Sequence, residues 1–82
     1  MKLFEPFDEL EIYTSGKTVL LKSRIPIPRC WIKISDMTGK ILFKTHEKDL
    51  TDMTISLNVK GGFYHVTVVT KNRFATKMIF LE

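Results

Sequence analysis

The sequence predicts an all-β domain, an antiparallel β-sandwich of six to seven strands. Short segments alternate apolar with polar residues, and turn residues recur between them at regular spacing. No segment shows the i, i+3, i+4, i+7 apolar pattern of an amphipathic helix. With 82 residues and 44% hydrophobic content, the chain is expected to form one domain over residues 1–82.

The first strands are expected on either side of a tight turn at Ser15-Gly16, over residues 10–14 and 17–23. Two prolines then interrupt the segment 24–28. Because proline cannot donate a ladder hydrogen bond, this segment is a loop, an edge segment or a crossing from one sheet to the other.

The clearest hairpin spans residues 30–45. Its first strand places three apolar side chains on one face and Trp31 on the other. Residues 36–39 form the turn, and in the returning strand Ile41 and Phe43 are expected on one face.

The remaining strands follow in the C-terminal half. The polar segment 46–52 is interpreted as a surface connection, and 54–58 as a short strand. Two glycines precede a strand over 63–70, and a two-residue turn leads to the closing strand over 73–81.

Three aromatic residues, Trp31, Phe63 and Phe74, are predicted to fill the core, because a small sandwich needs their volume. Their alternative role is a stacking platform for nucleic acid beside the basic residues Lys33, Arg73 and Lys77. Because these rings are expected in the core, nucleic acid is disfavoured as a partner. The net charge of +4, concentrated in segment 17–33, keeps it as a third possibility.

The sequence offers no catalytic, metal or cofactor residues. Cys30 and His65 lack the context of a nucleophile and its base, and a lone cysteine can form no disulfide within the chain. The scattered Asp residues lack the ligand spacing of a calcium loop, and Gly61-Gly62 lacks that of a phosphate loop.

No membrane-spanning segment and no secretory signal is recognisable, because acids and a proline occupy the N-terminal residues where an apolar run would be needed. The expected location is therefore the cytoplasm if the chain is complete. It is the cell surface or the exterior if the chain belongs to a longer exported protein.

Two motifs resemble the C-terminal sorting domains of type IX secretion in Bacteroidetes. Residues 32–41, IKISDMTGKI, resemble their D-x-x-G hairpin, and residues 55–68, ISLNVKGGFYHVTV, resemble their G-x-Y strand start. Residues 76–80, TKMIF, are similar to the closing strand, so the motif-bearing part covers 30–81. Related small immunoglobulin-like domains of secreted proteins share the first two features.

The resemblance implies an immunoglobulin-like sandwich that an outer-membrane export machinery recognises as a protein partner. It also implies scaffold residues that shape the recognised surface: Asp36, Gly39, Lys40, Gly62, Tyr64 and Lys77. The expected function is a non-catalytic secretion or cell-surface module. The alternative is a protein- or carbohydrate-binding accessory domain, which requires an exposed apolar patch on one sheet.

Overall fold

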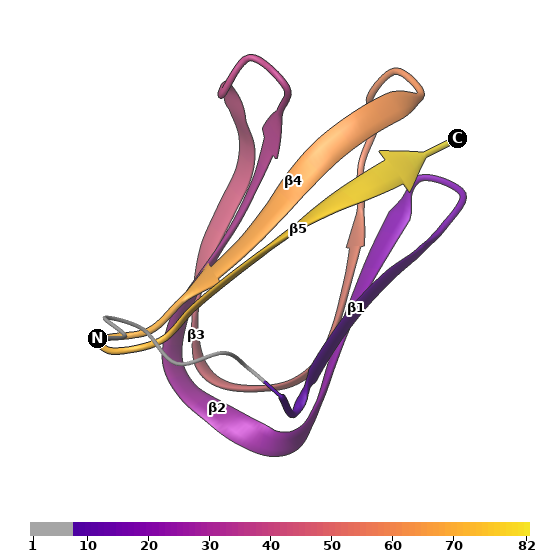
Figure 1. Ribbon diagram of the computed structural model, residues 1–82. Helices are drawn as coiled ribbons and strands as arrows, with labels where there is room; N and C mark the ends of the chain where they lie inside the picture. Colours follow the sequence, from indigo (N-terminus) through magenta and orange to yellow (C-terminus); the bar gives the residue numbers. More distant parts are fainter. Residues whose placement is uncertain (1–7) are drawn as a thin grey trace.

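A computed structural model describes residues 8–82, and the predictions made for residues 1–7 lie outside that range. These residues form five antiparallel strands (Figure 1). Their bounds are β1 Leu10–Ser15, β2 Thr18–Asp36, β3 Ile41–Ser56, β4 Gly62–Val69 and β5 Phe74–Leu81. The described residues contain no helix, which agrees with the predicted all-β class.

Strands β2 and β3 are long because each continues from one layer of the fold into the other. Figure 1 shows both strands bending together at the base of the molecule. The pairing register shifts between Lys22 and Ile27, and beyond the bend Arg29 has a φ of 46°. Segment 24–28 is therefore the crossing between sheets, one of the three interpretations of its prolines.

The bend divides the strands into two layers. The three-stranded layer contains β1, residues 18–22 of β2 and residues 52–56 of β3. The four-stranded layer contains residues 41–47 of β3, residues 30–36 of β2, β4 and β5, in that spatial order. Seven strand segments thus come from five continuous strands, which is why the sequence suggested six to seven.

The core lies between the layers and consists mainly of aliphatic side chains. Val19 and Leu21 contribute from one layer, and Ile32, Ile34, Val66 and Val68 from the other. Period-2 alternation places these residues inside and their sequence neighbours outside. Aliphatic residues alone therefore fill most of the interior.

The segment 46–52 is strand, so its interpretation as a surface connection was wrong. It forms the middle of β3, and its Leu50 is only 1% exposed. Its polar composition arises because most of its side chains face solvent at the bend. One buried leucine among polar residues gives too weak a period to identify a strand.

The alternation predicted for residues 41–44 is also interrupted. Ser35 pairs with Ile41, whereas the preceding Ile34 pairs with Phe43, so Leu42 is an extra residue in the returning strand. Such a bulge changes which side chains share a face. Ile41 is 49% exposed while Phe43 packs against the core, so the two do not share a face as predicted.

The prediction that Trp31, Phe63 and Phe74 fill the core was wrong. Trp31 is 50% exposed, Phe63 52% and Phe74 41%. Trp31 lies between Cys30 and Ile32, which are both fully buried, so strand geometry turns the indole outward. The expectation that the core needs aromatic volume failed because mainly aliphatic side chains fill the inward positions.

Candidate recognition face

The outward side of the four-stranded layer carries a contiguous set of side chains, here called the aromatic face. The pairing register places cross-strand partners of the four strands next to one another on this side. They are Trp31, Lys33 and Ser35 of β2; Ile41, Lys44 and His46 of β3; Phe63, His65, Thr67 and Val69 of β4; and Phe74, Thr76, Met78 and Phe80 of β5.

Most of the exposed apolar bulk of the described chain lies on this face. Nine large hydrophobic residues are exposed, and six of them belong to it. These six are Trp31, Ile41, Phe63, Phe74, Met78 and Phe80, each at least 41% exposed. Single exposed hydrophobic residues are ordinary on a protein surface, whereas a gathering on one sheet indicates an interaction site.

The aromatic rings gather at the two ends of the face. At one end the Trp31 and His46 rings have centroids 4.4 Å apart, and the Lys44 ammonium lies 5.5 Å from the Trp31 ring centroid. At the other end Phe63 contacts Phe80 edge-to-face, with centroids 5.2 Å apart. Val69, the partner of Trp31 on β4, lies six positions after Phe63, which is about 20 Å at the usual rise of a strand.

Between the two ends the face is hollowed, and polar and apolar side chains line the hollow together. A shallow concavity of about 510 Å³ crosses all four strands. It is lined by Lys33, Ser35, Gly39, Ile41, His65, Thr67, Thr76 and Met78. The Thr67 and Thr76 hydroxyl oxygens lie 3.3 Å apart, so one donates to the other across β4 and β5. The face thus combines hydroxyl, imidazole and ammonium groups with flanking rings.

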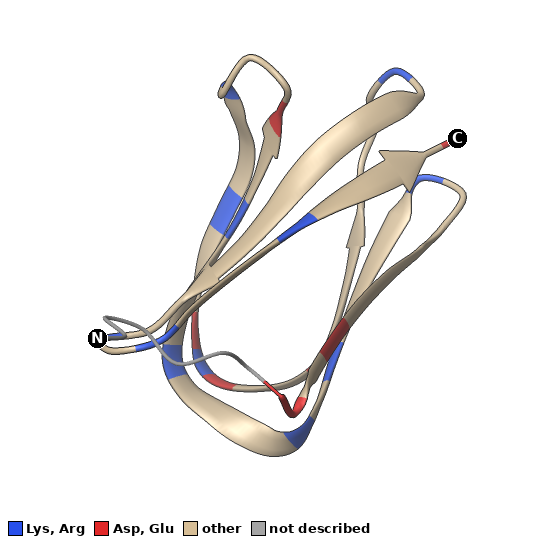
Figure 2. Cartoon of the chain, in the orientation of Figure 1, with Lys and Arg blue, Asp and Glu red and all other residues tan. Residues whose placement is uncertain are grey.

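The charge of the aromatic face has one sign. It carries Lys33 and Lys44, and none of its outward positions is Asp or Glu. Figure 2 shows β4 without a charged residue and red segments along β1 and at the bend. The outer side of the three-stranded layer instead places Lys22 between Glu11 and Asp52. The two outer surfaces therefore differ in both charge and ring content.

Three of the residues singled out by the sequence form the β2–β3 turn. The Asp36 carboxylate accepts hydrogen bonds from the Thr38 hydroxyl at 2.6 Å, the Thr38 amide at 2.9 Å and the Lys40 amide at 3.0 Å. These bonds, led by that of the hydroxyl, lower the pKa of Asp36. Gly39 has a φ of 94°, and its amide donates to the Asp36 carbonyl.

The other three lie on β4 and β5. Gly62 opens β4 with a φ of 151°, and the buried Tyr64 donates its hydroxyl to the Lys60 carbonyl at 2.6 Å. Lys77 donates its ammonium to the Ile12 carbonyl and so bridges β5 to β1. All six residues thus take part in turns, strand starts or bridges, and only Gly39 touches the aromatic face.

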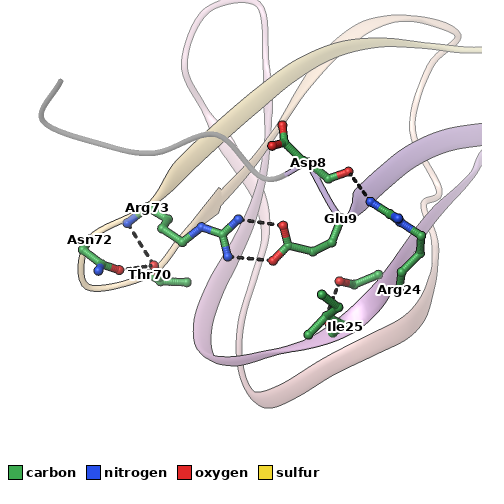
Figure 3. A network of polar contacts seen from close by, with 8 residues as sticks. Asp8, Glu9, Arg24, Ile25, Thr70, Asn72 and Arg73 are labelled. Carbon is green, nitrogen blue, oxygen red and sulfur yellow. Dashed lines mark hydrogen bonds and ion pairs between the residues drawn. The ribbon is translucent and has the colours of Figure 1, made fainter.

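A second polar cluster closes the opposite end of the layers (Figure 3). The two terminal nitrogens of Arg73 each donate a hydrogen bond to one carboxylate oxygen of Glu9. The backbone amide of Arg73 donates to the Thr70 hydroxyl. Arg24 donates to the Asp8 carbonyl. The hydrogen bonds from Arg73 lower the pKa of Glu9 to about 2. This cluster joins the β4–β5 turn to the start of β1.

The structure separates the one nucleophile candidate from its possible base. Cys30 is fully buried inside the sandwich, and burial raises the pKa of its thiol. His65 projects from the outer side of the four-stranded layer. Within residues 8–82, no three His, Cys, Asp or Glu side chains gather as metal ligands, and no helix could cross a membrane.

Comparison with solved structures identifies the architecture. A DUF3244 family protein from Bacteroides vulgatus, described as having an immunoglobulin-like β-sandwich fold, superposes with a TM-score of 0.82. The two share 23% identity over 90% of this chain and 84% of that one. This chain has an immunoglobulin-like β-sandwich fold. No family model matches the sequence, and no curated protein matches it.

The immunoglobulin-like sandwich explains how the face is presented. Strands β2 and β4 have partners on both sides, so the aromatic face stands on the middle of a sheet. Sequence reasoning placed Trp31, Phe63 and Phe74 on strands but not on the surface. The signal that could have placed Trp31 was present, because it alternates with Cys30 and Ile32, which fill the opposite face of its strand.

Proposed function

We propose that this domain is a non-catalytic recognition module that binds a partner through the aromatic face. The observation that carries the proposal is the gathering of six of the nine exposed large hydrophobic residues on one side of one sheet. An exposed apolar patch on one sheet is the feature required of an immunoglobulin-like binding domain.

Two further features support a binding role for this face. Its side chains stand on a sheet whose central strands are paired on both sides, so the rings are held in a fixed arrangement. Aromatic residues also supply much of the energy of recognition surfaces, because they bury a large area at a small cost in side-chain entropy.

The proposal is tested by screening the labelled domain against arrays of neutral glycans, acidic glycans and peptides. Trp31→Ala and Phe80→Ala remove one ring from each end of the face. Tyr13→Ala is the matched control, because Tyr13 is 46% exposed on the three-stranded layer. We expect ligands whose binding is lost in both face variants and kept in the control. Binding that survives both face variants would overturn the proposal.

A role in export is a second proposal, in which the domain addresses a longer protein to the cell surface. It is supported by the position of β5, which ends the strand order and carries the residues that resemble the closing sorting strand. Fusing residues 1–82 to a reporter in a host with type IX secretion tests it. The proposal expects an external reporter that becomes intracellular when residues 76–82 are deleted. A reporter that is intracellular in both forms would contradict it.

A further inference from the structure

The aromatic face carries two lysines that lie opposite each other on neighbouring strands. Lys33 and Lys44 are direct cross-strand partners on the same side of the β2–β3 pair. Like charges directly opposite one another on neighbouring strands destabilise a sheet. Among residues 8–82 the one ion pair is that of Glu9 with Arg73, so neither lysine has an acidic partner there.

From this arrangement we infer that the aromatic face binds an anionic polysaccharide, with a carboxylate or sulfate group held between Lys33 and Lys44. The inference rests on the proposed function and names the class of its ligand. A bound anion would neutralise the repulsion between the two ammonium groups. The cost to the sheet in the free protein then becomes a source of affinity in the complex.

The rest of the face fits a sugar chain. A pyranose ring has an apolar C–H side that packs on aromatic rings and hydroxyl groups that need hydrogen-bonding partners. Trp31 flanks the lysine pair, and Ser35, Thr67 and His65 line the adjoining hollow. The rings of Phe63 and Phe80 lie about 20 Å from the Trp31 end, so an extended ligand of several residues can contact both.

An acidic peptide fits this face less well. An extended peptide gains much of its affinity by pairing its backbone with an exposed strand edge. Strands β2 and β4 are already paired on both sides under the aromatic face. A ligand over these two central strands is therefore held by side chains, which favours a molecule rich in hydroxyl and anionic groups.

Nucleic acid and a second copy of the chain are disfavoured by the charges. The basic segment 17–33 does not form a track, because Lys22 points outward from the three-stranded layer and Lys33 from the four-stranded layer. A single lysine pair neutralises few phosphates. Two copies meeting face to face would bring four lysines and no carboxylate from this face into one interface.

Equilibrium binding to five probes tests the inference at low and at physiological salt. The probes are polygalacturonate, dextran sulfate, neutral dextran, polyglutamate and single-stranded poly(dT). Lys33→Gln and Lys44→Gln each remove one ammonium of the pair, and Lys22→Gln removes one from the other layer as a matched control. We expect about a tenfold loss of affinity for an anionic polysaccharide in each face variant. The control should change by less than twofold.

Several results would overturn the inference. They are absence of binding to both anionic polysaccharides, equal affinity for neutral dextran, polyglutamate or poly(dT), and an equal loss in Lys22→Gln. Thermal unfolding shows whether each variant is folded. The double variant with Lys33→Met and Lys44→Met removes both charges of the pair and is a second test of their role in binding. A neutral glycan or peptide that binds in a Trp31-dependent way would leave the proposed function standing while the anionic ligand fails. If every array ligand binds the Trp31→Ala and Phe80→Ala variants as tightly as the unchanged domain, both the proposed function and the anionic ligand are refuted.

Discussion

Arg73 and Glu9 form a bidentate ion pair, in which each terminal guanidinium nitrogen lies 2.7 Å from a different carboxylate oxygen. The pair joins the turn between β4 and β5 to the start of β1, which lie in different layers. Both side chains are mostly buried, at 23% and 13% exposure, so solvent screens the pair only in part.

This pair predicts a loss of stability in acid. The pKa of Glu9 is lowered from 4.5 to about 2 in the folded state. Its contribution is therefore complete above pH 4.5 and disappears as the pH falls towards 2. We expect Glu9→Gln to cost about 1–2 kcal/mol at pH 7 and almost nothing at pH 2. Urea unfolding of both proteins at several pH values measures this, and a constant difference would contradict the account.

Leu50 tests whether residues 46–52 form a core-bearing strand. Because this side chain is 1% exposed, Leu50→Ala should lower the free energy of unfolding by about 2–4 kcal/mol. Lys48→Ala, two residues away on the same strand and exposed, should change it by less than about 0.5 kcal/mol. Equal effects of the two substitutions in urea titrations would place Leu50 outside the core.

Gly39 tests the turn between β2 and β3. Its φ of 94° suits glycine, and a Cβ there would meet no neighbouring atom. Any cost of Gly39→Ala is therefore a backbone cost, about 1 kcal/mol or somewhat more. The exposed Met37→Ala in the same turn is the control. Thermal unfolding with equal midpoints for the two variants would be inconsistent with this geometry.

Cys30 tests the absence of a reactive thiol. Burial and the raised pKa both keep it from forming a thiolate. We expect a thiol-specific disulfide reagent at pH 8 to modify Cys30 slowly in the native protein and rapidly in urea. Fast modification of the native protein would require an accessible, activated thiol.

Much of the fold could be predicted because the strongest signals are local. The alternation around Ile32 and around Val66 fixes two central strands, and Asp36 with Gly39 fixes the turn. The bend of β2 and β3 could not be derived in this way. It depends on where two long strands cross between layers, and polar side chains at the crossing conceal the strand period.

The aromatic face was missed because two rules conflicted. Burial preference assigned Trp31 to the core, while the period of its own strand assigned it to the surface. Strand period prevailed, since Cys30 and Ile32 already occupy the interior. The pairing of Lys33 with Lys44 depends on hairpin register and on a bulge at Leu42, which the sequence pattern did not reveal.

The most direct test of the central claim is chemical-shift mapping of the isotope-labelled domain during titration with the tightest array ligand. The account predicts shifts of the Trp31 indole N–H and of backbone amides along β4 and β5, with the amides around Tyr13 and Leu20 unchanged. Shifts confined to the three-stranded layer would contradict the assignment of the aromatic face as the binding surface.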